Sequence, residues 1–161
     1  METDASSWIV ANETVAPAFV LARQGYDVWL ANTRGGIHSQ QHLTLKPTEK
    51  EFWFFSWEEI GVYDLPAIID HIVDETGYDK ITYMGHSQGV TCLMAGSTLR
   101  PDYFNAKINL AINLAPPISM HYNNNTAWRK LTEPNLVRTI EKTAVAMNLL
   151  QWFPYNLESG G

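Results

Sequence analysis

The residues whose types and spacing could do chemistry are the five in Gly85-His86-Ser87-Gln88-Gly89. They match the Gly-x-Ser-x-Gly pattern of a nucleophile elbow, in which a serine lies on a sharp turn between a strand and a helix. Such a turn strains the serine backbone and holds its hydroxyl clear of the sheet edge. The next backbone N–H lies at the helix N-terminus, where the helix dipole stabilises a developing oxyanion. The pattern therefore predicts Ser87 as a nucleophile and Gln88 as an oxyanion-hole donor.

The other three residues of the motif have structural roles in this interpretation. Side chains at Gly85 and Gly89 would collide with the neighbouring strand and helix, so both glycines are expected for steric reasons. His86 is not expected to be the general base, because it adjoins the serine in a constrained turn and its ring cannot reach the hydroxyl in line. We interpret it as a structural or pocket-lining residue. The alternative for the whole motif is a plain strand–turn–helix junction whose serine is only a helix N-cap.

The flanking sequence predicts the elements that would position this turn. A capping box is expected at Ser56-Trp57-Glu58-Glu59, and Asp64 is expected to cap the helix that follows it. Aromatic residues are expected to anchor a long loop at 37–55, namely Trp53, Phe54 and Phe55. Strands separated by helices of ten or more residues indicate βαβ units and a parallel sheet, so the expected class is α/β. Hydrophobic periodicity and turn residues place strands at 26–31, 81–84 and 108–114, and helices at about 14–24, 64–76 and 89–99.

Composition excludes several other kinds of function. Of the 161 residues, 45% are hydrophobic, the net charge is −6, and the eleven Lys and Arg are scattered. This pattern argues against a nucleic-acid partner or an anionic-membrane patch. No stretch approaches the ~20 apolar residues of a transmembrane segment. One cysteine, Cys92, rules out a disulfide framework, and neither His38 and His42 nor any carboxylate pair forms a metal site. No Gly-rich phosphate loop follows a strand, so a phosphate-binding βαβ unit is not expected.

Longer blocks around the elbow resemble the acid lipases, the family of gastric and lysosomal acid lipases within the α/β-hydrolases. The blocks are Tyr26-Asp27-Val28-Trp29-Leu30-Ala31-Asn32-Thr33-Arg34-Gly35, Glu51-Phe52-Trp53 with Phe55-Ser56-Trp57-Glu58-Glu59, Tyr63-Asp64-Leu65-Pro66-Ala67-Ile68-Ile69-Asp70, and the elbow itself. Their order and spacing also resemble the family's, over about residues 8–117. Departures at Gly36, His38 and Val90-Thr91 concern substrate detail and leave the nucleophile intact.

The resemblance implies hydrolysis of neutral lipid esters, such as triacylglycerols or sterol esters, at a lipid–water interface and without a cofactor. It also suggests a secreted, lysosomal or endomembrane protein, although the N-terminus has neither the basic start nor the apolar run of a signal peptide. We expect a partial α/β-hydrolase fold, incomplete at both ends. Residues 1–115 would form the central part of the core, and residues 116–161 the beginning of the cap. An amphipathic stripe at Leu136, Val137, Ile140, Ala144 and Met147 marks a helix in this second part.

The triad acid and base are not expected within this chain. In this fold they follow the serine in the order Asp, then His. Downstream of Ser87 the sequence has one aspartate, Asp102, and one histidine, His121, and both are interpreted as ordinary loop residues. The family's oxyanion loop, and the strand before it, would precede Met1, which would leave unpaired edges at 26–31 and 80–85. A non-catalytic lipid- or partner-binding relative, and a carboxylesterase of small esters, remain the alternatives.

Overall fold

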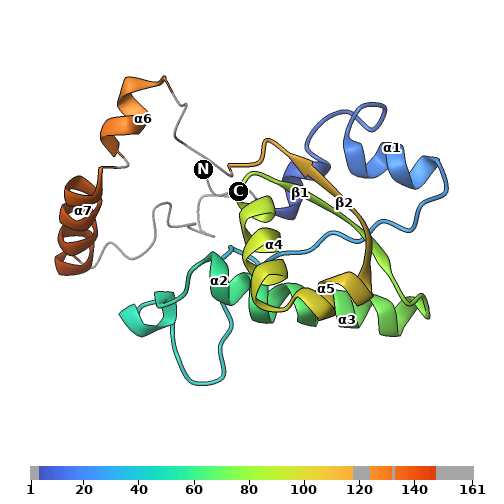
Figure 1. The fold of residues 1–161 in the computed structure, drawn as a ribbon, viewed down its shortest axis with the longest axis horizontal. Helices are drawn as coiled ribbons and strands as arrows, with labels where there is room; N and C mark the ends of the chain where they lie inside the picture. Colours follow the sequence, from blue (N-terminus) through green and yellow to red (C-terminus); the bar gives the residue numbers. More distant parts are fainter. Residues whose placement is uncertain (1–3, 118–123, 132, 148–161) are drawn as a thin grey trace, which may run out of the picture.

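The computed structural model describes residues 4–117, 124–131 and 133–147, and Figure 1 shows their arrangement. The centre is a pair of strands that is flanked by helices. In chain order the elements are η1 (Ala5–Trp8), α1 (Pro17–Arg23), η2 (Lys50–Trp53), α2 (Trp57–Glu59), η3 (Ile60–Asp64), α3 (Leu65–Thr76), β1 (Ile81–His86), α4 (Gln88–Leu99), α5 (Pro101–Lys107), β2 (Ile108–Leu114), α6 (Thr126–Leu131) and α7 (Pro134–Ala146).

The two strands are parallel, and their register runs from Ile81 opposite Ile108 to His86 opposite Leu114. The crossover between them consists of α4 and α5, as expected for a βαβ unit. Both strands therefore end at the same edge of the sheet, where β1 leads into the predicted elbow. The expected parallel α/β arrangement and the strand at 108–114 are confirmed, and β1 runs two residues further than predicted.

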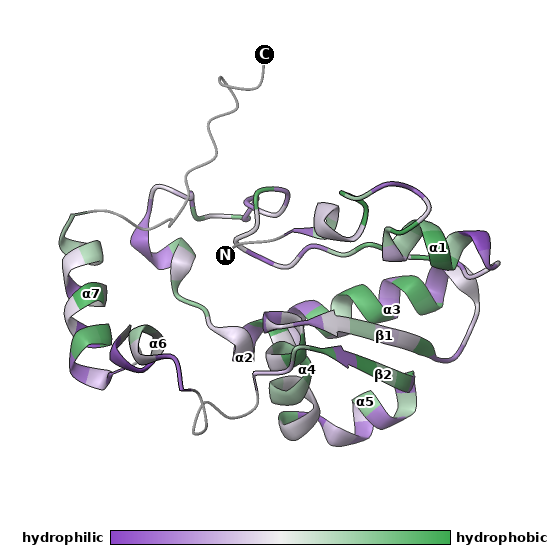
Figure 2. Ribbon diagram, turned by 90° about the horizontal axis from the view of Figure 1, so that it is seen from above, coloured by the Kyte–Doolittle hydropathy of each residue, from purple (hydrophilic) through white to green (hydrophobic). Residues whose placement is uncertain are grey.

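The core lies between one face of the sheet and the helices α3, α4 and α5. Its buried members are Ile60, Leu65, Ile69, Cys92, Leu93 and Phe104, and Ile81, Tyr83 and Ile108 of the strands pack against them. In Figure 1, α1 lies on the opposite side of the two strands from α3 and α5. The apolar residues (green) on α3, α4 and the strands in Figure 2 mark the same layer. The predicted amphipathic stripe of α3 thus faces the core, and the helix ends at Gly77 with a left-handed φ of 73°.

The predicted capping box is confirmed, whereas the predicted cap at Asp64 is wrong. Ser56 accepts the N–H of Glu58, and the Glu59 carboxylate accepts the N–H of Ser56 at 2.7 Å. From there α2 continues through a π-helical turn, η3, directly into α3, so Asp64 has helical backbone angles and no orphan N–H to cap. Its carboxylate instead accepts the backbone N–H of Arg34 at 2.8 Å and the Nε–H of Arg34 at 2.7 Å.

Three other elements differ from expectation. Residues 26–31 form no strand, and no other described segment pairs with them. In the loop at 37–55 the buried anchor is Phe52, whereas Phe54 is 69% exposed. Helix α5, which begins at Pro101, was not predicted.

The second part of the chain contains the amphipathic helix α7, as predicted. In both figures α6 and α7 lie apart from the sheet. The apolar side chains of α7 are partly exposed, with Leu136 at 38% and Val137 at 44%. His121 lies outside the described residues.

Candidate functional site

Ser87 lies at the junction between β1 and α4, in the one-residue turn that joins them. Its backbone angles are φ 50° and ψ −109°, a conformation that non-glycine residues rarely adopt. Strain of this kind typically costs about 1–3 kcal/mol and persists only where the surroundings hold it. Here the Ser87 N–H donates to the carbonyl of Leu114 at 3.0 Å, and the Ser87 carbonyl accepts from Val90 at 3.0 Å. The side chain is exposed to solvent.

A second strained residue lies at the end of the neighbouring strand. In the described part of the chain, Ser87 and Ala115 are the two non-glycine residues with positive φ. They are neighbours across the carboxyl edge of the sheet, because Ser87 bonds the residue just before Ala115. This edge is where open α/β sheets bind their ligands. From the sequence, only a boundary between the core and the cap was predicted at Ala115. Pro116 indicates a turn of the chain there, but it does not predict the positive φ of Ala115.

The two glycines of the motif are not equivalent. A Cβ on Gly85 would lie 2.7 Å from a ring carbon of Tyr83 and 3.1 Å from the backbone carbon of Gly89, so no side chain fits there. A Cβ on Gly89 would meet nothing closer than the Tyr83 hydroxyl at 3.5 Å, which is an ordinary contact. The close contacts at Gly85 fit the steric role predicted for it. At Gly89, in the first turn of α4, the predicted collision is absent, because a Cβ there would make only this ordinary contact.

Gln88 is the first residue of α4, and its N–H is one of the amides that a helix N-terminus leaves free. Val90 and Thr91 donate to Ser87, whereas the Gln88 N–H has no acceptor among the described residues. The dipole of a twelve-residue helix adds to the positive potential at this end. An anion next to Ser87 would thus meet a free donor and a favourable field.

Tyr83 is a site residue that sequence reasoning missed. Its hydroxyl donates to the carbonyl of Gly89 at 2.9 Å, and its ring fills the space beside Gly85. Burial raises the pKa of the Tyr83 phenol well above its ordinary value, with the nearby Cys92 adding to the effect. The phenol therefore stays protonated and remains a donor. The alternation of side chains along β1 could have indicated this contact, because Tyr83 and Gly85 are two residues apart and share the core-facing side.

Cys92, the other nucleophilic side chain of α4, is not a competing candidate. It is 3% exposed, and burial, followed by the charge of Asp64, raises the pKa of its thiol to about 11. A thiol is a poor nucleophile until it ionises. Cys92 thus contributes packing to the core.

The described histidines and Asp102 do not form a triad with Ser87. His86 is exposed at the end of β1, His38 lies 3.4 Å from Asp4, and the His42 ring accepts backbone amides of its own loop. His71 packs edge-on against Trp29. Asp102 lies in the first turn of α5, beyond α4, a helix about 18 Å long at ~1.5 Å per residue. No described side chain hydrogen-bonds to the Ser87 hydroxyl.

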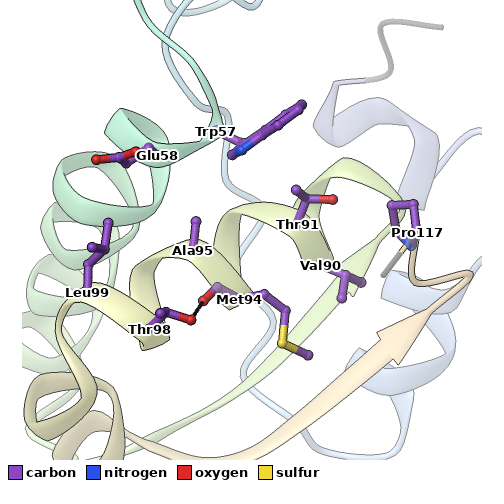
Figure 3. Close-up of a pocket in the computed structure, with 9 residues that line it drawn as sticks. All are labelled: Trp57, Glu58, Val90, Thr91, Met94, Ala95, Thr98, Leu99 and Pro117. Atoms are coloured by element: carbon purple, nitrogen blue, oxygen red, sulfur yellow. Dashed lines mark hydrogen bonds between the residues drawn. The ribbon is translucent and has the colours of Figure 1, made fainter. Parts of the chain in front are cut away.

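A hollow of about 400 Å³ lies beside α4, between this helix, α2 and Pro117. Figure 3 shows its lining residues, of which Trp57 and Pro117 flank the exposed side of α4. The hollow reaches the first turn of α4 through Val90 and Thr91, whereas Ser87 and His86 are not among its lining residues.

Within the described ranges no cluster of three or more His, Cys, Asp or Glu could hold a metal ion. No helix among the described residues is long and apolar enough to cross a membrane.

Comparison with known proteins places the elbow in a family. A family model for the alpha/beta hydrolase fold matches residues 5–134. Lipase 1 of Drosophila melanogaster is 47% identical over 113 residues, which are 70% of this chain and 26% of the relative. Human lipase member K is 41% identical over 128 residues, covering 80% of this chain and 32% of the relative. Human lipase member J is 46% identical over 121 residues, which cover 74% of this chain and 32% of the relative. The chain thus spans between a quarter and a third of the length of these curated relatives.

The family match covers most of the chain, the sheet is parallel, and the strand–serine–helix turn lies where the motif predicted it. The chain belongs to the α/β-hydrolase fold family and is of the acid lipase type.

Proposed function

We propose that the protein is a serine ester hydrolase in which Ser87 is the nucleophile. The observation that carries this proposal is the conformation of Ser87, whose φ of 50° and ψ of −109° hold an exposed hydroxyl at the carboxyl edge of the sheet. A serine that served only as an N-cap would have an extended backbone and would bond the amides of the first helical turn. The Ser87 side chain makes no such cap.

The geometry supports acyl transfer through a covalent intermediate. The Ser87 oxygen attacks the ester carbonyl, its proton passes to a general base, and the carbonyl oxygen becomes an oxyanion beside the Gln88 N–H. Collapse of this intermediate breaks the C–O bond to the alcohol, which leaves with the proton from the base. Water then attacks the acyl-enzyme in the same way and releases the carboxylic acid. No redox step or cofactor is needed.

The substrate that we propose is a neutral lipid ester, a triacylglycerol or a sterol ester, met at a lipid–water interface. Support comes from the names of the relatives, each of which is called a lipase. The blocks around Trp29 and Trp57 favour a lipid ester over a small ester, since they resemble the acid lipases in particular. By the same resemblance we propose a secreted, lysosomal or endomembrane location, and a cap that begins within residues 116–161.

We further propose that this chain is part of a longer lipase, whose triad Asp and His lie outside the described residues. Two findings support this. The relatives are three to four times longer than the matched segment, and none of the described acidic or imidazole groups bonds to Ser87. A non-catalytic binding protein with the same fold is the alternative that the second finding also allows.

The test is covalent labelling of the full-length protein with a fluorophosphonate ester, followed by mass spectrometry of the modified peptide. We expect the label on Ser87, and we expect Ser87→Ala to lower triacylglycerol or sterol-ester hydrolysis by on the order of 10⁴- to 10⁶-fold. Ser97→Ala, on the same helix, is the matched control and should keep full activity. Labelling that persists in Ser87→Ala would show that the nucleophile is another residue. A folded protein that neither labels nor hydrolyses esters would support the binding alternative.

A further inference from the structure

The side chain of Tyr83 joins the strand before the elbow to the helix after it. The Tyr83 hydroxyl donates to the Gly89 carbonyl at 2.9 Å, which ties β1 to the first turn of α4. The ring lies against Gly85 so closely that an added Cβ there would come within 2.7 Å of it. One side chain therefore contacts residues two positions before and two positions after Ser87. None of the other described hydrogen bonds from a side chain spans the turn in this way.

The elbow needs such a tie because its backbone is strained. Left alone, Ser87 would relax towards a common region of φ and ψ, and α4 would tilt or shift relative to β1. A second support comes from the sheet, where the Ser87 N–H bonds the Leu114 carbonyl at 3.0 Å. That bond fixes the strand side of the turn. Tyr83 is what fixes the helix side, and the helix carries the Gln88 N–H.

Building on the proposed function, we propose that Tyr83 is a positioning residue of the active site. It holds the first turn of α4 against β1 and so keeps the Gln88 N–H and the Ser87 hydroxyl in the arrangement that the reaction requires. Tyr83 itself does not touch the substrate in this proposal, because its side chain points into the core. Burial keeps its phenol protonated, so the tie is expected to persist throughout the working pH range.

The chain offers a matched control for this proposal. Tyr103 also has a partly buried phenol that packs on the same core, and its hydroxyl donates to an oxygen of Asp70 at 2.8 Å, with the Pro66 carbonyl of the same helix a second acceptor at 3.0 Å. That bond joins α5 to α3, and no recorded contact links it to the elbow. Tyr83→Phe and Tyr103→Phe thus each remove one hydroxyl and its hydrogen bond from the core, but only the first removes a tie across the turn.

The experiment compares the two variants in the full-length protein, with lipid-ester kinetics, thermal unfolding and amide hydrogen exchange. We expect both variants to lower Tm by similar amounts. Tyr83→Phe should lower kcat about two- to tenfold, the range expected for losing one hydrogen bond that holds the reacting groups, with KM unchanged. It should also speed amide exchange in peptides that cover residues 85–91. Tyr103→Phe should leave kcat, KM and this exchange unchanged.

A Tyr83→Phe variant that loses thermal stability but keeps both kcat and the exchange at residues 85–91 would overturn the proposal and make Tyr83 a packing residue. An equal fall of kcat in both variants would overturn it as well, because the loss would then follow from general destabilisation. Failure of the proposed function looks different. In that case the wild type itself would not hydrolyse esters, and the exchange comparison alone would decide whether Tyr83 holds the turn.

Discussion

At the scale of single residues, the two glycines of the elbow differ in the room that their surroundings leave for a side chain. Gly85 is enclosed by the Tyr83 ring and by the backbone of α4, whereas a Cβ on Gly89 would meet only the Tyr83 hydroxyl, at the ordinary distance of 3.5 Å. The sequence motif treats the two glycines alike. The difference arises because one glycine precedes the turn, where strand and helix converge, and the other follows it.

We predict that alanine at these two positions has opposite effects on stability. Gly85→Ala should lower the free energy of unfolding by about 1–3 kcal/mol, since neither a buried ring nor backbone can give way easily. Gly89→Ala should be neutral or stabilising by up to ~1 kcal/mol, because alanine favours the helix and meets no close neighbour. Urea denaturation of the full-length protein and its two variants measures both. Equal destabilisation by the two substitutions would contradict this account of the turn.

The role of a residue was predictable where a motif fixes the backbone conformation. It was much less predictable where the role depends on contacts between segments that are distant in the sequence. The position of Ser87 in a strand–helix turn followed from five letters of sequence. The roles of Tyr83 and Ala115 did not, because they depend on how α4 packs against β1 and on the way β2 ends. Asp64 was assigned as a cap on local grounds, and its true partner, Arg34, lies thirty residues earlier in the chain.

At the scale of elements, the continuous helix that supports α4 begins with the capping box at Ser56 and is also held by an ion pair at Asp64. The π-helical turn η3 brings Gly61 against the backbone of α4, where an added Cβ would lie 2.4 Å from the Cys92 carbonyl oxygen. At the end of the same turn, Asp64 receives the Arg34 guanidinium, with Nη2 at 2.6 Å. The Arg34 group also lies over the rings of Phe55 and Tyr63. The segment at 32–36 is thereby fixed to the helix that packs on α4.

We predict that Asp64→Asn lowers the free energy of unfolding by about 1–3 kcal/mol. An amide accepts through one oxygen only and turns N–H groups towards the guanidinium, so it cannot satisfy the backbone N–H and the Nε–H of Arg34 together. The Asp64 side chain is 12% exposed, so water cannot fully replace the lost acceptor. Asp74→Asn, at an exposed position of α3, is the control and should change stability by less than ~0.5 kcal/mol. Chemical denaturation measures the free energy of unfolding of both variants. Equal values for Asp64→Asn and Asp74→Asn would contradict a stabilising role for the Asp64–Arg34 ion pair.

The type of each element was predictable from its hydrophobic periodicity, whereas the pairing of strands in the sheet was not. The helix stripes of α3 and α7 and the alternation in β2 gave the right elements. The segment 26–31 has the composition of a strand, yet a strand forms only beside a hydrogen-bonding neighbour, and none is present among the described residues. Helix α5 was missed because its seven residues are too few to show a period.

At the scale of the whole molecule, the two faces of the sheet differ in how well they are covered. One face packs on α3 and α4, where Tyr83 and Ile81 join the core. On the other face the parallel register aligns His86 with Leu114 and Thr82 with Leu110. There Leu110 is 54% exposed and Leu114 is 40% exposed. Both outer edges of the two-stranded sheet also lack a partner strand among the described residues.

We therefore predict that residues 1–161, expressed alone, form a molten or aggregation-prone state with helical signal but without fixed tertiary packing. A two-stranded sheet is marginal by itself, and each buried backbone group without a partner costs about 1–3 kcal/mol against a total stability of only ~5–15 kcal/mol for a domain. The six tryptophans make near-UV circular dichroism a sensitive probe of packing. We expect a weak near-UV spectrum, dye binding to exposed apolar surface, and a broad thermal transition. A monomer with a sharp near-UV spectrum and cooperative unfolding would show that the uncovered face is tolerated, and it would favour a self-contained binding module over a part of a larger lipase.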